Sequence, residues 1–246
     1  MSDSSAVALD IPNWIKFCSN MAPMAAIFVF MAPYPTIRQV VKDKSVGSLP
    51  LLPYSSMISN CILWFVYGIL TQEKKVWFTN LIGLVFGLFY FSRFIKYVPP
   101  KSLTLPGTVR QHMQACLGII AATSIWVLIC YLTVRRKNQW MLYASIMVGK
   151  AAVLFCLLMF ASPLSALKTV LKTRSARSIP LPFTLATILN CFFWSVAGLG
   201  EFHDFNIYFP NLMGLAFGLI QVALKILFEN GSSVLTKSED QIELAM

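Results

Sequence analysis

The chain has 246 residues, of which 57% are hydrophobic and only 12% are charged, and its mean hydropathy is +0.68. A soluble protein carries about 25% charged residues, so the composition excludes a soluble globular protein. The formal net charge is +10, but the lysines and arginines form short clusters between long apolar stretches. That pattern is typical of membrane proteins, and binding to nucleic acid is not expected.

Seven apolar stretches follow one another along the chain. Each is close to the ~20 residues that a helix needs to cross a bilayer core, and each must be helical because backbone groups in hydrocarbon need partners within the segment. The sequence therefore predicts an all-α integral membrane protein with seven transmembrane helices. A six-helix alternative would place both termini on one side. The stretches span residues 17–38, 52–70, 77–97, 115–134, 141–163, 181–200 and 207–228.

The basic residues between these stretches are divided unequally over the two sides of the membrane. About thirteen lie after the first, third and fifth stretches and toward the C-terminus, against about six on the other side. Because Lys and Arg stay in cytoplasmic loops, we expect an extracellular or lumenal N-terminus and a cytoplasmic C-terminus. The membrane is expected to be the plasma membrane or an endomembrane. The sequon at Asn230 then faces the cytoplasm and should stay unglycosylated.

Residues that commonly carry chemistry are few and scattered. The six cysteines form no CxxC pair and no metal-ligand spacing, which predicts packing residues and neither a metal nor another cofactor. His112 and His203 lie in predicted loops and are expected to lack partners. The sequence therefore predicts a protein that is not an enzyme.

The two halves of the chain repeat each other. Residues 33–68 align with residues 163–198 at an offset of 130, with about thirteen identities in thirty-six positions. The segment that begins at Asn80 recurs from Asn211, at an offset of 131. Biased composition does not produce matched Trp, Pro, Asn and Gly together, so the chain is an internal duplication. The identical pairs include Pro33/Pro163, Asn60/Asn190, Cys61/Cys191, Trp64/Trp194 and Gly68/Gly198.

The duplication divides the seven predicted helices into two sets of three, joined by the fourth. Three crossings would invert a second copy, and a fourth crossing restores its direction, so the repeats are parallel. We expect an extracellular or lumenal N-terminal segment, a first three-helix repeat, a loop with the linker helix, a second three-helix repeat and a cytoplasmic tail. These span residues 1–16, 17–97, 98–134, 138–228 and 229–246.

Short motifs recur at matching places in both repeats. The first repeat carries Pro33-Tyr-Pro-Thr-Ile-Arg and Trp64-Phe-Val-Tyr-Gly, and the second carries Ala161-Ser-Pro-Leu-Ser and Pro210-Asn. Their order and spacing resemble the SWEET sugar transporters (MtN3/saliva repeat proteins) in their eukaryotic two-repeat form, over about residues 20–228. The resemblance implies two three-helix bundles, each packed in the order 1-3-2, with a sugar held between them. It also implies facilitative, bidirectional sugar transport.

The resemblance implies that each repeat offers the sugar one aromatic or small residue from its second helix and one Asn from its third. These residues are Trp64, Asn80, Trp194 and Asn211. The chemistry of sugars agrees, because their C–H faces suit an aromatic ring and their hydroxyl groups suit amides, which both donate and accept. Asn60 and Asn190 lie one helical turn before the tryptophans and share their face, so we predict that they line the same site.

Each of these residue types also has a purely structural interpretation. Tryptophans of membrane proteins commonly form an interfacial belt, and asparagines can join helices beside faces of small residues. The position of Trp64 and Trp194 well inside their stretches, and the symmetry of all the pairs, favour a substrate site.

The resemblance also implies gating residues. Four prolines match the family's helix prolines, whose missing N–H group permits a kink, although a proline can equally end a helix. They are Pro33, Pro53, Pro163 and Pro180, and Pro182 competes with the last of them. Tyr67 and Asp204 resemble the extracellular gate pair, with His203 as a rival one residue away.

The acidic residues indicate the transport mechanism. All ten lie in predicted loops, tails or helix ends, whereas proton- and sodium-coupled carriers usually need a buried carboxylate or an ion site. We therefore expect uncoupled alternating access around a midplane site, and the two bulky tryptophans favour monosaccharides. Lys150 lies inside the fifth stretch. It could be neutral there, extend its side chain toward the outer face or line the cavity, where it would favour an anionic substrate.

Other classes fit the sequence less well. A PQ-loop-type carrier of amino acids or of another small metabolite has the same two-repeat plan, but its Pro-Gln pair is replaced by Pro33-Tyr34 and Pro163-Leu164. A seven-helix receptor has no need of a duplication. The expected partners are a small sugar, membrane lipid and, as is usual in the family that the chain resembles, further copies of the chain in a homo-oligomer.

Overall fold

The computed structural model describes residues 11–99, 107–134, 139–159, 161–176 and 179–243. These residues form helices and no strand, so the predicted all-α fold is confirmed. Most of the predicted N-terminal segment and part of the loop before the linker helix lie outside the described residues. The helices are α1 (Asn13–Met31), α2 (Tyr34–Asp43), α3 (Leu52–Leu70), α4 (Lys74–Lys96), α5 (Val109–Thr133), α6 (Gln139–Met159), α7 (Ala161–Thr173), α8 (Leu181–Gly200) and α9 (Phe205–Glu243).

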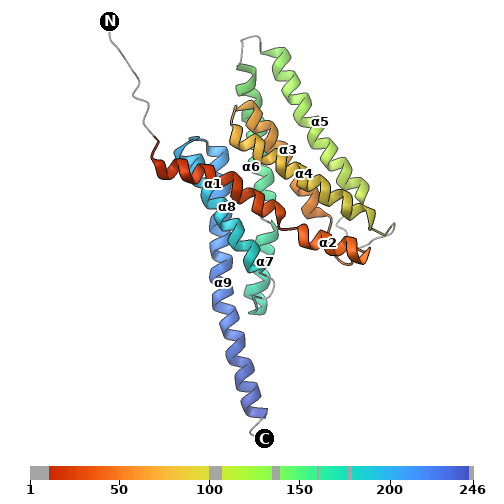
Figure 1. The fold of residues 1–246 in the computed structure, drawn as a ribbon, viewed down its shortest axis with the longest axis vertical. Helices are drawn as coiled ribbons and strands as arrows, with labels where there is room; N and C mark the ends of the chain where they lie inside the picture. The colour runs from red at the N-terminus through yellow and green to blue at the C-terminus, as the bar shows by residue number, and fades with distance from the viewer. Residues whose placement is uncertain (1–10, 100–106, 135–138, 160, 177–178, 244–246) are drawn as a thin grey trace.

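The first predicted crossing consists of two helices, and Pro33 lies between the end of α1 and the start of α2. Proline has no N–H group to donate and its ring clashes with the preceding turn, which explains why the break falls at this residue. The fifth predicted crossing is described as α6 and α7, and the residue between them, at position 160, lies outside the described residues. Figure 1 shows α2 continuing beyond the bend at the end of α1, and α9 running from the bundle to the C-terminal end of the chain.

Six segments of the described chain are long and apolar enough to cross a membrane. They comprise α1 with α2, then α4, α5, α6, α8 and the part of α9 up to Phe228. The remaining predicted crossing corresponds to α3, which is 19 residues long and carries the polar side chains of Tyr54, Ser55 and Ser59 among its buried residues. Large apolar side chains such as Leu132 and Leu227 point outward and are about two-thirds exposed, as expected where the surroundings are hydrocarbon.

The helices pack in the order that the resemblance implies. In the first repeat α4 lies between α1 and α3, and in the second α9 lies between α6 and α8, which is the order 1-3-2 in both. Between the repeats α1 packs on α8 and α3 packs on α6, while the linker helix α5 packs on α3 and α6. The half-helices α2 and α7 stay with their own repeats, against α4 and α9.

The repeat is visible in the backbone as well as in the sequence. Among the described residues, the non-glycine positions with positive φ fall into two repeat-related pairs. Lys44 and Arg174 both have φ of 52°, and Gln72 and His203 have φ of 62° and 49°. The first pair keeps the offset of the sequence repeat and the second exceeds it by one position. The extra residue of the second repeat therefore lies in the connection between α8 and α9.

A matched pair of glycines lets the second and third helices of each repeat approach closely. A Cβ atom on Gly68 would lie 2.5 Å from the backbone nitrogen of Trp77, and one on Gly198 would lie 2.8 Å from that of Tyr208. Backbone atoms cannot move aside as a flexible side chain can, so only glycine fits at these crossings.

The linker helix begins earlier than predicted and corrects one expectation. Thr108 caps α5 with a reciprocal pair of hydrogen bonds to Gln111, the arrangement known as a capping box. His112 therefore lies in the first turn of α5 and not in a loop. It is buried, and its Nδ1 lies 2.8 Å from the Ser55 hydroxyl oxygen, so the prediction that His112 lacks a partner was wrong.

Candidate functional site

A cavity of about 220 Å³ lies between the two repeats. Helices α1, α3 and α4 of the first repeat and α6, α8 and α9 of the second contribute to its wall. All six residues that the sequence analysis assigned to substrate binding are among those that line it. The lining residues are Ala26, Val29, Phe30, Asn60, Trp64, Val76, Thr79, Asn80, Cys156, Met159, Asn190, Cys191, Trp194, Ile207, Pro210 and Asn211.

The wall of this cavity has the symmetry of the repeat. Most lining positions occur in both halves, at the offset of the sequence repeat on the first and second helices and one position further on the third. No charged side chain is among the lining residues of the described chain. The paired positions are Ala26/Cys156, Val29/Met159, Asn60/Asn190, Trp64/Trp194, Val76/Ile207, Thr79/Pro210 and Asn80/Asn211.

The two tryptophans of the cavity are interior residues. Trp64 and Trp194 are only 8% and 7% exposed, whereas a residue of an interfacial belt faces the lipid headgroups. Trp64 packs edge-on against Tyr67, with ring centroids 5.6 Å apart. Trp194 lies near Phe202, with centroids 6.5 Å apart. Each indole is therefore held in place and presents apolar surface to the cavity.

The asparagines on the third helices are oriented by their own helices. The Asn80 side-chain nitrogen donates to the Val76 carbonyl at 2.9 Å, and the Asn211 nitrogen donates to the Ile207 carbonyl at 2.7 Å. These bonds stay within one helix and do not join neighbouring helices. They use one hydrogen of the amide nitrogen, and the carbonyl oxygen is the group of each side chain that can accept a bond from a ligand.

Sequence reasoning missed two polar residues of the cavity wall, Thr79 and Cys156. Cys156 was predicted to be a packing residue, but its sulfur contacts the side chains of Trp64 and Asn60. Residue spacing along α6 could not have indicated these contacts, because they join helices that are far apart in the sequence.

The end of the bundle formed by the α3–α4 and α8–α9 connections is tied together across the repeats, and we refer to it as the closed end. The Tyr67 hydroxyl donates to Asp204 Oδ2 at 2.6 Å and accepts from the Asn206 side-chain nitrogen at 3.0 Å. His203, the rival of Asp204, is exposed and its backbone is left-handed. The structure thus joins Tyr67 to Asp204, and sequence reasoning missed Asn206.

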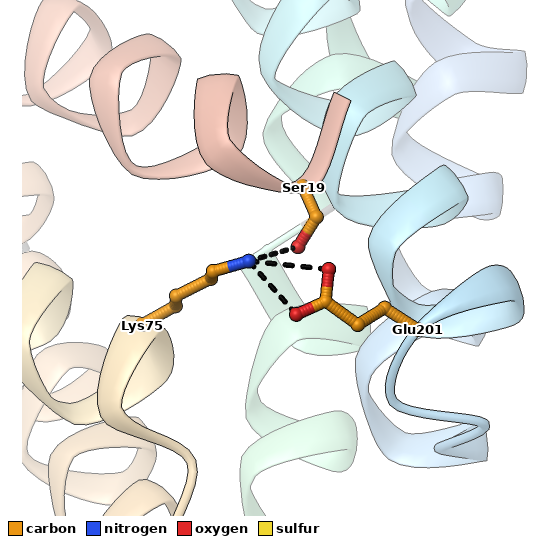
Figure 2. Close-up of polar contacts among 3 residues, drawn as sticks. All are labelled: Ser19, Lys75 and Glu201. Carbon is orange, nitrogen blue, oxygen red and sulfur yellow. Dashed lines mark hydrogen bonds and ion pairs between the residues drawn. The ribbon is translucent and has the colours of Figure 1, made fainter. Parts of the chain in front are cut away.

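A second contact crosses the closed end, and sequence reasoning did not find it. Figure 2 shows Lys75 of α4 reaching Glu201, at the end of α8, and Ser19 of α1. The Lys75 ammonium group lies 2.8 Å from Glu201 Oε1 and 2.9 Å from the Ser19 hydroxyl oxygen. Nearby, partial burial raises the pKa of Glu73, and the negative charges of Glu201 and Asp204 raise it further.

Three of the proposed gating prolines, Pro33, Pro53 and Pro180, lie at or just before helix starts. Pro53 is the second residue of α3, and the residue at that position of α8 is Pro182, whereas Pro180 only precedes the helix. By helix position Pro182 is therefore the counterpart of Pro53. Pro33 precedes α2, and the side chain of Pro163 lies outside the described residues.

Lys150 does not belong to the cavity. It is exposed on the outer face of α6 and is not among the lining residues. A long side chain at such a position can extend toward the headgroups while its stem covers apolar surface. The expectation of an anionic substrate therefore loses the residue on which it depended.

Comparison with known proteins gives one consistent result. A family model described as "Sugar efflux transporter for intercellular exchange" matches twice, at residues 16–102 and 146–232, so that each match covers one repeat. The chain is 27% identical over 236 residues to the bidirectional sugar transporter SWEET11 of Arabidopsis thaliana, an alignment that covers 95% of this chain and 77% of the relative. It is 27% identical over 215 residues to the sugar transporter SWEET1 of Dictyostelium discoideum, covering 87% and 92% of the two chains.

A solved structure agrees with these sequence matches. The structure of a eukaryotic SWEET transporter superposes with a TM-score of 0.74 at 25% identity and covers 88% of this chain and 97% of the other. The two matches of the family model together cover well over half of the chain. The chain therefore belongs to the SWEET family of sugar efflux transporters, in its two-repeat form.

Proposed function

We propose that this protein is a facilitative, bidirectional uniporter of sugars and that the cavity between the repeats is its substrate site. Membership of the SWEET family, and relatives described as bidirectional sugar transporters, support the substrate class. The small cavity and its two bulky indoles favour monosaccharides.

The observation that carries this proposal is the chemistry of the cavity wall. A sugar has apolar C–H faces and a ring of hydroxyl groups, and the wall offers two indoles and four amides in repeat-related pairs. Amides both donate and accept hydrogen bonds, as hydroxyl groups do. A buried amide without a partner is costly, so four amides around one cavity are explained best by a polar ligand.

The same wall argues for transport without ion coupling. The acidic residues in the described part of the chain whose side chains are placed are Asp43, Glu73, Glu201 and Asp204, and all of them lie at helix ends. None lines the cavity, where a coupled carrier would need a carboxylate. Transport down a gradient by alternating access is the mechanism that this arrangement favours.

A PQ-loop-type carrier of amino acids fits the cavity less well. A cationic amino acid would need an acidic partner and any amino acid would need a group that compensates its carboxylate, but the lining residues are uncharged. Because burial of an unpaired charge is strongly unfavourable, a neutral ligand is preferred.

The mechanism assigns a role to each part of the chain. Residues 17–97 and 138–228 form the two bodies that move against each other, and residues 98–134 form the connection and linker helix between them. Pro33, Pro53, Pro163 and Pro182 permit bending, and the Tyr67–Asp204 pair closes one face. The positive-inside pattern assigns the closed end and residues 1–16 to the extracellular or lumenal side and residues 229–246 to the cytoplasm. Assembly into a homo-oligomer stays a prediction.

Uptake of labelled glucose, fructose and sucrose in cells that lack hexose carriers tests the proposal. Asn80→Ala and Asn211→Ala each remove an amide from the wall, and each should raise KM about five- to tenfold because a hydrogen bond is lost. Asn20→Ala, on the exposed side of α1, is the matched control and should behave as wild type. A protonophore should leave the initial rate unchanged.

Each arm of this experiment can contradict one part of the proposal. Absence of sugar uptake by the wild type at the cell surface would refute sugar transport. Unchanged KM in both Asn variants would remove them from the substrate site, and collapse of uptake with the proton gradient would replace uniport by coupled transport. Glycosylation of Asn230 would reverse the proposed orientation.

A further inference from the structure

Four of the seven repeat-related pairs in the cavity wall differ in identity, and one of them is Ala26 and Cys156. These residues are counterparts at the offset of the repeat, on α1 and α6, and both line the cavity. Helix α6 packs on α3, which carries Trp64 and Asn60, and α1 packs on α8, which carries their counterparts. The cysteine and the alanine thus occupy equivalent places beside equivalent pairs of side chains.

In the half that contains Cys156, the thiol connects the two neighbouring side chains. The Trp64 indole nitrogen donates to the sulfur at 3.4 Å, and the thiol donates to the Asn60 carbonyl oxygen Oδ1 at 3.2 Å. A thiol is a weak donor and a weak acceptor, and here it serves in both roles. Trp64 is held in one orientation, and the Asn60 oxygen already has a partner.

In the other half, the methyl group of Ala26 can make neither bond. Asn190 Oδ1, the counterpart of the satisfied oxygen of Asn60, is buried and has no hydrogen-bond partner among the described residues. Most buried carbonyl groups in folded proteins have a partner, and one that lacks it needs an explanation, such as a water or another bound group that supplies the bond. This oxygen belongs to a residue of the cavity wall.

We propose that the sugar binds in one orientation because the repeat symmetry is broken at this pair. Asn190 Oδ1 accepts a hydrogen bond from one sugar hydroxyl group, whereas Cys156 occupies the Asn60 oxygen and positions the Trp64 indole as a fixed apolar face. Asn190 is thus the specificity-determining residue of the wall, and Cys156 is a positioning residue. This inference rests on the proposed transport of sugars.

Singly deoxygenated sugars, measured as competitors of labelled-sugar uptake, test the role of Asn190. In the wild type one deoxy position should weaken competition about tenfold, the size of a lost hydrogen bond. That loss should disappear in Asn190→Ala and persist in Asn60→Ala, which is the matched control on the equivalent turn of α3. Persistence in both variants, disappearance in the Asn60 variant, or no loss at any position would overturn the assignment.

A change at position 26 tests the same idea without removing either amide. Ala26→Cys places a donor beside Asn190, as Cys156 is placed beside Asn60, and should raise KM about tenfold with Vmax within about twofold of wild type. Ala26→Val adds similar volume without a donor and should raise KM by less than about threefold. Equal effects of the two changes would indicate steric hindrance, and no effect of Ala26→Cys would mean that Asn190 Oδ1 is not the acceptor.

The positioning role of Cys156 has its own readout. Cys156→Ser keeps a donor and acceptor and should stay within about threefold of wild type in KM, whereas Cys156→Ala frees the indole and should raise KM about tenfold. A role in packing alone would give both variants the same KM. A wild type that transports no sugar would refute the proposed function itself, whereas sugar transport with equal effects in both halves would refute only this inference.

Discussion

The two sides of the closed end occupy equivalent places in the repeat but are held by different chemistry. Lys75 of α4 and Asn206 of α9 are counterparts in the repeat, and each reaches across to the other half of the molecule. Ser19 and Gly149 are also counterparts and lie beside these side chains. The repeat-related positions are therefore the same, but the contacts differ. One side is held by the Lys75–Glu201 ion pair, and the other by the Tyr67 hydroxyl between the Asn206 amide and the Asp204 carboxylate.

The two sides differ most in their exposure to solvent. The side chains of Lys75 and Glu201 are 29% and 22% exposed, so water and salt screen their attraction. Tyr67 is only 3% exposed and makes a short bond to a carboxylate. Buried charge-assisted hydrogen bonds are stronger than exposed ion pairs. The Tyr67 side should therefore contribute most of the stability of the closed state.

Tyr67→Phe tests this difference directly and should have the largest effect. It removes the only hydroxyl group that links Asp204 to the first repeat in the described contacts, and it leaves a carboxylate without that donor. We expect the closed state to lose about 2 kcal/mol. Spin-label distances between the α3–α4 and α8–α9 connections measure the population of the closed state. Tyr143→Phe, on the exposed face of α6, is the control, and an equal response of the two variants would contradict the argument.

Gly149→Ala should have the next largest effect because it acts on the same side through packing. The new Cβ atom would lie 2.6 Å from the Tyr67 ring and 2.9 Å from the Asn206 side-chain nitrogen. Overpacking of this kind costs about 1–3 kcal/mol, so we expect a lower melting temperature in detergent.

The linker helix supplies a matched control for that glycine. A Cβ atom on Gly118 would meet nothing within 4 Å, and Gly118→Ala should raise stability slightly through helix propensity. If Gly149→Ala were as stable as Gly118→Ala, the neighbourhood of Tyr67 would be looser than described.

The sequence predicted the crossings well because the bilayer imposes a length and a composition on each helix. The predicted stretch at 52–70 is α3, residue for residue, and the break in the first crossing lies at Pro33, which the repeat had already matched to Pro163. The start of α5 was predicted six residues too late, because the capping Thr108 and the polar turn that contains His112 lie outside the apolar stretch.

The paired residues of the cavity could be predicted because the same residue type occurs at the matching position of both repeats. Contacts between residues that differ in the two repeats could not be predicted. Lys75 was predicted only as one of the basic loop residues and Glu201 only as an acid at a helix end, and their pairing across 126 positions follows from the packing of α1 on α8. Cys156 was missed for the same reason, since its counterpart in the repeat is an alanine.

The ion pair on the other side of the closed end should contribute less. A double-mutant cycle of Lys75→Met and Glu201→Gln, measured by thermal unfolding, should give a coupling energy of about 0.2–1 kcal/mol. That coupling should fall as salt is raised. Lys74→Met, at an exposed neighbouring position, should show no coupling with Glu201→Gln. A coupling as large as that of a buried hydrogen bond to a charged group, about 2 kcal/mol, would place this ion pair on a par with the Tyr67 side.

The smallest effect should come from Glu73, the counterpart of Asp204 in the first repeat. Burial, followed by the charges of Glu201 and Asp204, raises the pKa of Glu73 above its ordinary value of 4.5, although Lys75 opposes this. A carboxyl group with a raised pKa in the folded protein favours the protonated form. Its contribution to stability is therefore complete below pH 4.5 and is lost as the pH rises through the raised value.

Glu73→Gln should remove that part of the pH dependence, because glutamine resembles the protonated side chain and does not titrate. Between pH 4.5 and about neutral pH, the melting temperature of the variant should fall less steeply than that of the wild type. Asp43→Asn, at the exposed end of α2, should leave the wild-type slope in place. Identical slopes for the wild type and Glu73→Gln would mean that folding leaves the pKa of Glu73 unchanged. Lys75 would then offset the effects of burial and of the charges of Glu201 and Asp204 on that pKa.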